Sequence, residues 1–148
     1  MTGVQTCALP ICWVRLDATK SRQAIVNVLS NAIKYSCAGT PVAVTLAAAE
    51  HDGRPGVALQ VRDQGIGMSP AQCARAFERF YRADPSGHIL GAGLGLSIVK
   101  SLVELQQGQV KLASTPGAGT TVTLWWPLDH VEAAGADAPV ETPDLAEA

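Results

Sequence analysis

Residues 27–35 read NVLSNAIKY, and this stretch lies within an amphipathic helix around which the rest of the chain has to fold. Apolar residues recur at helical spacing along one side of it: Ile25, Val28, Leu29 and Ala32. This period predicts a helix from about Ala18 to Tyr35 with one face buried. The two asparagines of the stretch fall on the other side, so the helix also presents a distinctive polar face.

The polar face of this helix carries Asn27, Asn31 and Lys34, within about 60° of one another. Asparagine is a poor helix former, and an ordinary solvated face would favour Glu, Lys or Gln. Mg²⁺ takes hard oxygen ligands, keeps several waters and binds together with phosphates, so one amide oxygen suits it. A lysine one turn away would offset phosphate charge. Taken alone, the helix leaves a solvated face and a metal–phosphate site as equal alternatives.

Residues 63–68 read DQGIGM and place a carboxylate, Asp63, between a predicted strand and two glycines. Gly65 and Gly67 permit positive φ values or a close approach of the backbone to a ligand. A single motif of this kind is usually a plain turn at the end of a strand. The alternative is a carboxylate that accepts a hydrogen bond from the exocyclic amine of adenine, where guanine presents a carbonyl. One such bond contributes about 1.5–3 kcal/mol, or about ten- to a hundred-fold in affinity.

Residues 91–100 read GAGLGLSIVK, in which Gly91, Gly93 and Gly95 lead into a predicted helix. The amide groups at a helix N-terminus are free to bind an anion such as phosphate. The segment is not a Walker A loop, because no G-K-[ST] triplet enters the helix. It is not a dinucleotide fingerprint either, because the spacing is G-x-G-x-G and no strand precedes it. A flexible hinge before a helix is the alternative interpretation.

Alternating apolar residues predict four strands around these helices. Two strands, near residues 42–46 and 57–61, flank the sequence EHDGRPG and predict an antiparallel hairpin. Two more, near residues 110–114 and 120–126, are joined by a turn at residues 116–119. Together these elements predict an α/β fold: a two-layer sandwich with helices on one face of a mixed, mostly antiparallel sheet.

Two further helices are expected between the strands. The sequence SPAQ at residues 69–72 combines an N-cap, a proline at the first helical position and a capping-box glutamine. We expect this helix to reach about Phe80 and to bury three residues: Cys73, Ala76 and Phe77. A longer helix is expected over residues 94–106, ended by Gly108. Its inward-facing residues are expected to be Ile98, Leu102 and Leu105.

The composition fits one compact domain of 148 residues with a net charge of -2. This balance gives no indication of binding to nucleic acid or to a membrane surface. The most apolar run, residues 89–105, contains three glycines together with Lys100 and Glu104, so it does not predict a membrane span. The four cysteines lack metal-type or C-x-x-C spacing, which favours reduced thiols in a cytoplasmic domain.

The chain divides into three regions by composition. Residues 1–12, MTGVQTCALPIC, have no clear period and resemble translated adapter sequence, so we expect the natural protein to begin upstream. Residues 13–128 carry the folded domain. Residues 129–148 are rich in Ala, Pro, Asp and Glu and lack aromatic residues, which predicts a disordered acidic tail.

In this order, the segments resemble the ATP-binding domain of sensor histidine kinases from two-component systems. The matching segments are the asparagine box at residues 27–35, glycine boxes at residues 63–68 and 91–95, a phenylalanine box at residues 77–84 and a last glycine box at residues 117–120. The resemblance covers about residues 13–128. It implies the Bergerat ATP-binding fold, in which ATP lies between the helices and the sheet under a mobile lid, here near residues 82–92.

Carried over to matching positions, the resemblance implies a magnesium ligand at Asn31, supported by Asn27 one turn earlier. It also implies that Lys34 and Arg82 meet the phosphates and that Asp63 holds adenine. The remaining implied ATP-binding positions are Tyr35, Gly65, Gly67, Gly91, Gly93, Leu94, Gly95, Leu96 and Thr120. The implied cofactors are therefore ATP and magnesium.

Asn27 separates relatives of this fold. ATPases, chaperones and serine-kinase anti-sigma factors resemble one another in carrying Glu at this position, where it activates the attacking group. An amide cannot accept a proton at neutral pH, so Asn27 favours a histidine kinase. The family's acceptor histidine lies on an upstream helix, and none of His51, His88 and His130 fits it. The sequence HDGRP at residues 51–55 is one residue short of the acceptor box and lies in a predicted hairpin turn.

The resemblance thus implies the catalytic domain of a protein histidine kinase, which transfers the terminal phosphate of ATP to a histidine on a dimerisation domain absent from this sequence. A response regulator would receive the phosphate in turn. The domain would be cytoplasmic, in a parent protein that can be membrane-anchored upstream. It would be inactive alone because the acceptor histidine is absent. The family's opening helix and first strand are also missing from the sequence, which counts against independent folding. The alternatives are a non-catalytic nucleotide-binding or interaction module and, disfavoured by Asn27, an ATPase of the same fold.

Overall fold

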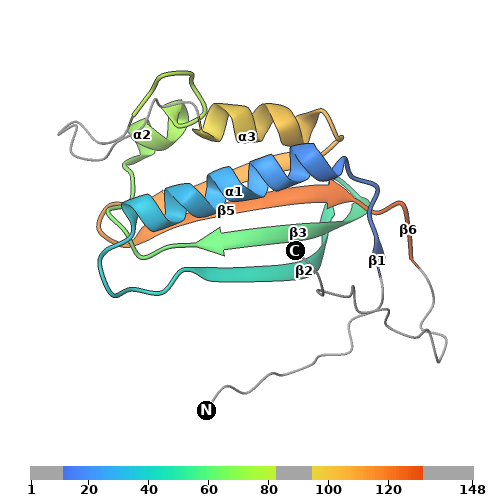
Figure 1. The fold of residues 1–148 in the computed structure, drawn as a ribbon, viewed down its shortest axis with the longest axis horizontal. Coiled ribbons are helices and arrows are strands. Elements are labelled where there is room, and N and C mark those ends of the chain that lie inside the picture. The colour runs from blue at the N-terminus through green and yellow to red at the C-terminus, as the bar shows by residue number, and fades with distance from the viewer. Residues whose placement is uncertain (1–11, 83–94, 132–148) are drawn as a thin grey trace, which may run out of the picture.

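The computed structural model describes residues 12–82 and 95–131, which form a layer of helices over a layer of strands (Figure 1). In chain order the elements are β1 (Cys12–Trp13), α1 (Ala18–Tyr35), β2 (Ala43–His51), β3 (Arg54–Arg62), α2 (Pro70–Arg75), α3 (Gly95–Glu104), β4 (Gln109–Thr115), β5 (Gly119–Pro127) and β6 (His130–Val131). None of the described helices is both long enough and apolar enough to cross a membrane.

The main sheet has the strand order β2-β3-β5-β4, and each neighbouring pair is antiparallel. The predicted α/β sandwich is therefore confirmed, and the described strands of its main sheet are antiparallel throughout rather than mixed. A separate two-stranded pair, β1 with β6, sets Trp13 beside His130. This pairing brings two segments from opposite ends of the sequence together at the right-hand end of Figure 1.

The core lies between the main sheet and the two longer helices, which pack against each other. Because successive side chains of a strand point to opposite faces, only alternate residues of β3 and β5 enter this core. The buried apolar cluster consists of Ala24, Val28, Ala32, Val61, Val99, Val103, Val122, Leu124 and Trp126. The edge strand β2 is covered less: Val44 and Leu46, paired with Val61 and Leu59, are 51% and 58% exposed.

Helix α1 begins and ends where the apolar period predicted, at Ala18 and Tyr35. Asp17 precedes it, and its Oδ1 accepts a hydrogen bond from the Lys20 backbone N–H at 2.9 Å. This N-cap bond, together with the nearby Lys20 ammonium, lowers the pKa of the Asp17 carboxyl. At the other end Ser36 is extended and donates its N–H to the Ala32 carbonyl. Local signals therefore define both ends of this helix.

The β2–β3 hairpin is confirmed, with a tighter turn than the sequence EHDGRPG indicated. His51 pairs with Arg54, so Asp52 and Gly53 alone form the turn. Both have positive φ values, 50° and 73°, as the two-residue turns that suit twisted strands require. The residues on either side of the turn consequently belong to the strands.

Helix α2 is shorter than predicted. Its capping box is present, with Ser69 Oγ accepting from Gln72 N–H and Gln72 Oε1 accepting from Ser69 N–H. The helix nevertheless ends at Arg75 and not near Phe80, because the chain continues through tight turns and Phe80 takes a left-handed φ of 65°. Ala76 is buried as expected, whereas Cys73 and Phe77 are only half-buried.

The described part of helix α3 runs from Gly95 to Glu104, two residues short of the predicted C-terminal end. Its innermost residues are Val99 and Val103, while Leu105 is 71% exposed and the prediction that it faces inward is wrong. Ile98 and Leu102 are half-buried beside this face. The chain turns away at Gln107, which has a φ of 61°, and Gly108 N–H returns to the Val103 carbonyl.

Candidate functional site

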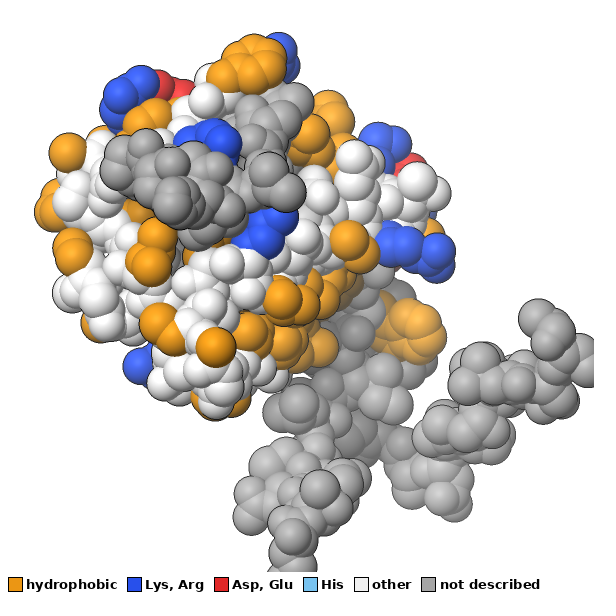
Figure 2. Space-filling model, turned by 60° about the vertical axis from the view of Figure 1, so that its left-hand side comes forward, with side chains coloured by type: hydrophobic (Ala, Val, Ile, Leu, Met, Phe, Trp, Pro, Cys, Tyr) orange, Lys and Arg blue, Asp and Glu red, His pale blue; other side chains and the backbone are white. Residues whose placement is uncertain are grey.

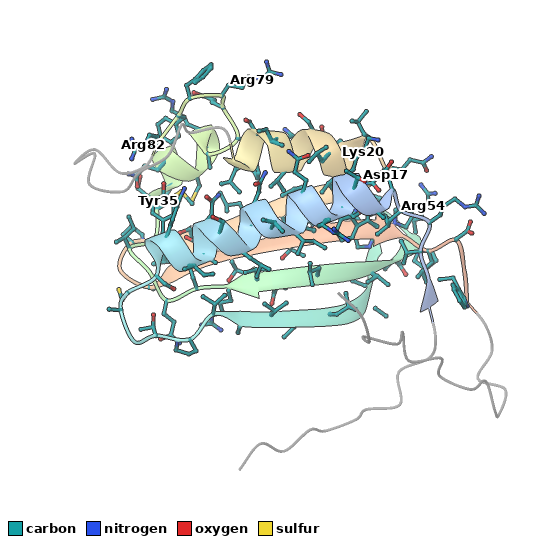
Figure 3. The ribbon with its side chains drawn as sticks, viewed as in Figure 1. Asp17, Lys20, Tyr35, Arg54, Arg79 and Arg82 are labelled. Atoms are coloured by element: carbon teal, nitrogen blue, oxygen red, sulfur yellow. The ribbon has the colours of Figure 1, made fainter. Side chains whose placement is uncertain are left out.

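A cavity of about 320 Å³ lies where α1 ends, α3 begins and β3 leads into the loop at residues 63–68. Figure 3 shows Tyr35 and Arg82 at this end of the molecule, and Asp17, Lys20 and Arg54 at the opposite end. Ten predicted ATP-binding residues line the cavity: Asn27, Asn31, Lys34, Tyr35, Asp63, Gly67, Arg82, Gly95, Leu96 and Thr120. Tertiary structure thus brings together five segments that are separate in the sequence.

The other four predicted positions are one described residue that does not line this cavity and three that lie outside the described residues. Gly65 forms an isolated bridge with Ser36 at the end of α1. Gly91, Gly93 and Leu94 fall within residues 83–94, outside the described residues, as does most of the predicted lid. Their proposed contacts with phosphate remain predictions.

Asp63 immediately follows β3 and is 6% exposed. Its Oδ1 accepts hydrogen bonds from the backbone N–H groups of Gly65 at 2.9 Å and Thr120 at 3.1 Å. Its own N–H donates to the Thr120 carbonyl at 2.9 Å. Among the described residues, no group donates to Oδ2. One carboxylate oxygen therefore fixes the side chain, and the other is available to a ligand in the cavity.

The two glycines of the DQGIGM loop allow the backbone to pass close to its neighbours. A Cβ atom on Gly65 would overlap the carbonyl of Tyr35, whose oxygen also accepts from Ile66 N–H at 3.2 Å. Gly67 has a φ of 66°, and a Cβ atom there would overlap the Thr115 carbonyl. The loop is therefore wedged between the end of α1 and the β4–β5 hairpin, a position that larger residues would obstruct.

The polar face of α1 borders the same cavity. Asn27 and Asn31 are half-buried on it, and Lys34 is exposed one turn beyond. Asn31 lies close to the start of α3. A Cβ atom placed on Gly95, the first residue of α3, would be only 3.2 Å from Asn31 Nδ2. Within the described structure neither asparagine side chain has a hydrogen-bond partner. On the other side of the helix, Val28 and Ala32 are buried, and Ile25 and Leu29 are half-buried against the core.

Arg82 provides the clearest electrostatic feature of the site. Its Nε and Nη2 atoms are buried, and within the part of the chain that the structure describes they have no hydrogen-bond partner. The segment before it is held by Arg75, which pairs with Glu78 at 3.0 Å and stacks on the Tyr81 ring at 4.4 Å. Buried donor groups without an acceptor are unfavourable, so an anion that entered the cavity and accepted from them would be stabilised here.

The surface around the cavity is rich in basic groups. Figure 2 brings this end of the molecule forward and shows Lys and Arg side chains more prominently than Asp and Glu. Among the cavity-lining residues that the structure describes, Asp63 is the only acidic one. A polyanionic ligand would therefore meet a favourable potential away from the Asp63 end.

Several apolar lining residues were not predicted from the sequence to belong to a site. They are Val28, Ala32, Val61, Ile66, Met68, Ala76, Ile98 and Val122. Ile66 and Met68 lie inside the motif DQGIGM, so their place in the motif was a signal that could have identified them. The others are core residues of helices and strands, and their sequence pattern does not distinguish a cavity wall from a closed core. Together they form apolar walls suited to a flat base.

A family model described as histidine kinase-, DNA gyrase B- and HSP90-like ATPase matches residues 16–130. The circadian input-output histidine kinase CikA of Synechococcus elongatus is 36% identical over 115 residues, which are 76% of this chain and 15% of that protein. The sensor histidine kinase YkoH of Bacillus subtilis is 39% identical over 113 residues, which are 75% of this chain and 24% of that protein.

Solved structures give the same result. The mycobacterial sensor histidine kinase MprB superposes with a TM-score of 0.69 at 33% identity, covering 78% of this chain and 76% of that one. The full-length kinase ShkA, solved with AMPPNP, superposes with a TM-score of 0.63, also at 33% identity. That match covers 80% of this chain and 24% of the other. The chain spans less than a quarter of the curated relatives CikA and YkoH, and it belongs to the histidine kinase-like ATPase family with the Bergerat fold, as the ATP-binding domain of a sensor histidine kinase.

Proposed function

We propose that this domain transfers the terminal phosphate of ATP to a histidine carried by a separate dimerisation domain. The observation that carries the proposal is the polarity of one cavity. A backbone-fixed carboxylate stands at one end, and at the other stand basic groups that have no partner among the described residues. A response regulator would take the phosphate from that histidine. The domain would act in the cytoplasm, within a parent protein that can be anchored in the membrane elsewhere.

Adenine recognition would take place at Asp63. Oδ1 is engaged by two backbone amides, so Oδ2 would accept from the exocyclic amine of adenine. Guanine presents a carbonyl oxygen at that position, which a carboxylate repels. The flanking apolar residues Ile66 and Met68 would contact the faces of the base. Tyr35, at the end of α1, would lie near the nucleotide.

The triphosphate would extend along α1 toward Arg82 and the start of α3. Lys34 and the unpaired Arg82 guanidinium would bind its oxygens, together with the backbone of Gly95 and Leu96. The residues fit magnesium through Asn31, with Asn27 beside it, because the ion needs few protein ligands when phosphates and water complete its shell. The described residues hold no cluster of three or more His, Cys, Asp or Glu side chains that would indicate another metal. When bound, magnesium neutralises phosphate charge.

Transfer to a separate histidine is favoured over hydrolysis by what the cavity lining lacks. Asn27 stands where a general base would be needed, and the one acidic residue among the described lining is Asp63 at the adenine end. Phosphoryl transfer depends mainly on positioning and charge neutralisation, so the site can hold ATP without activating water. A nucleophile from outside would then decide whether transfer occurs.

The histidine whose side chain is described does not face the phosphate end. His51 lies at the β2–β3 turn, 3.4 Å from Asp52 and with its ring 5.2 Å from that of Trp125. It is not among the residues lining the cavity. His88 lies outside the described residues, and His130 belongs to β6 at the end opposite the cavity (Figure 1). These positions support an acceptor on another domain.

The proposal is tested by incubating the chain with ATP labelled at the terminal phosphate. We expect binding of ATP, slow release of phosphate and no label on the chain itself. Adding a purified dimerisation domain from a relative such as MprB should yield acid-labile label on that domain, and its His→Ala variant should remain unlabelled. Rapid phosphate release would indicate an ATPase instead. Binding without transfer to any tested dimerisation domain would favour a non-catalytic nucleotide-binding module.

A further inference from the structure

Ser114 joins the two segments that hold Asp63, although it does not line the cavity. It lies in β4 opposite Thr120 of β5 and is half-buried. Its Oγ accepts from Met68 N–H at 2.8 Å and donates to the Gly119 carbonyl at 3.0 Å. A third contact, to Thr120 Oγ1, measures 2.8 Å. One small hydroxyl thus connects the DQGIGM loop with the β4–β5 hairpin.

The chemistry of a hydroxyl assigns a direction to each of these bonds. Ser114 has one proton to donate and two lone pairs that accept. A carbonyl can only accept, so the Ser114 proton goes to Gly119. The arrangement that satisfies all three contacts therefore has the Thr120 hydroxyl donating to Ser114 Oγ. In that arrangement the hydroxyl of Thr120, a residue that lines the cavity, offers only lone pairs to a further partner.

The same two segments also hold the carboxylate. Thr120 N–H donates to Asp63 Oδ1, and Asp63 N–H donates to the Thr120 carbonyl. A further bond joins Gly117 N–H to the Ile66 carbonyl at 2.7 Å. Ser114 is the side chain that completes this backbone network. It fixes where the loop sits and which way the Thr120 hydroxyl points.

We propose that Ser114 is a positioning residue for nucleotide selectivity, acting through Met68 and Thr120. This inference rests on the proposed recognition of adenine by Asp63. With Ser114 in place, both Asp63 Oδ2 and Thr120 Oγ1 offer acceptors, which suit an exocyclic amine and repel a carbonyl. Without it, the Thr120 proton is free to turn into the cavity and donate to the carbonyl of guanine.

The test measures dissociation constants for ATP and GTP by calorimetry on the full chain, with thermal stability measured in parallel. In Ser114→Ala we expect ATP affinity to fall about five- to tenfold while GTP affinity changes less than about twofold. Ser114→Thr keeps the hydroxyl and suits a strand, so its ATP/GTP ratio should match that of the unmutated chain. The control is Thr123→Ala, which removes a 3.3 Å contact with Gln60 in the neighbouring strand and should leave the ratio unchanged.

A merely structural role would give a different pattern. Equal losses for ATP and GTP in Ser114→Ala, or a lower melting temperature with an unchanged ratio, would overturn the inference. If Ser114→Ala does not fold, Ser114→Cys decides, since a thiol bonds weakly and should shift the ratio in the same direction by a smaller factor. Absence of ATP preference in the unmutated chain would instead contradict Asp63 as the adenine-binding residue, so the two failures are distinguishable.

Discussion

At one end of the cavity, the Asp63 carboxylate receives two backbone hydrogen bonds on a single oxygen, whereas at the other end two buried nitrogens of Arg82 have no partner within the described residues. The first end is held by the loop, which is hydrogen-bonded both to the end of α1 and to the β4–β5 hairpin. The second is bounded by a short helix, a series of turns and the start of α3. At the first end the protein itself supplies hydrogen bonds to the polar group, and at the second end the described residues do not.

This difference assigns different tasks to the two ends. A group that is already oriented loses little entropy on binding and can discriminate between ligands that differ in one atom. A buried cation without a partner gains a strong interaction from any suitable anion and discriminates little. We therefore expect selectivity to reside at Asp63 and much of the affinity for a triphosphate to reside at Arg82 and Lys34.

The largest expected effect comes from Asp63→Asn. The amide would turn a donor toward the exocyclic amine of adenine, so ATP affinity should fall about ten- to a hundred-fold and the preference over GTP should vanish. Titration with fluorescent analogues of both nucleotides measures this. Gln64→Ala, at the exposed neighbouring position, is the matched control. Equal binding of ATP and GTP by the unmutated chain would show that the adenine assignment is wrong.

For Arg82→Gln we expect a smaller loss of ATP affinity and, unlike Asp63→Asn, no change in nucleotide preference. Loss of the guanidinium should weaken ATP about tenfold, leave adenosine binding unchanged and preserve the ATP/GTP ratio. Without nucleotide the melting temperature should stay the same or rise, because a buried unpaired charge is removed. Arg79→Gln serves as control, since Arg79 belongs to the same segment but is exposed (Figure 3). A lower melting temperature without nucleotide would indicate that Arg82 has a structural role.

The smallest effect is expected for Asn31→Leu, and only when magnesium is present. The amide oxygen contributes one ligand among several, so ATP affinity with magnesium should fall about three- to tenfold, to the value measured without it. Asn31→Asp supplies another oxygen and should retain the dependence on magnesium. The measurement is an ATP titration with and without the metal. If the Leu variant responds to magnesium as the unmutated chain does, Asn31 is not a ligand.

Local signals were sufficient for several elements. The bounds of α1 were predicted because the apolar period and the Asp17 cap act within a few residues of each other. The same holds for the start of α2 at Ser69. Local signals were not sufficient to predict where α2 ends or which face of α3 is buried. After Arg75 the chain continues in turns, and Phe80 takes a left-handed φ that its residue type does not favour. Val99 rather than Leu105 faces inward because of where α3 packs on α1 and the sheet.

For the site, the sequence by itself identified the residue types: amides and a lysine on one helical face, a carboxylate before two glycines, and glycines leading into a helix. These are properties of short segments, in which the spacing of residues along the chain determines which way their side chains point. Tertiary structure alone decided how each group is used. It divided the two oxygens of Asp63 between backbone and cavity, left two buried nitrogens of Arg82 without a partner among the described residues and joined Ser114 to the loop. The bond from Thr120 to Asp63 and the bond from Met68 to Ser114 join residues that are 57 and 46 positions apart, because hydrogen bonds are set by distance in space and not along the chain.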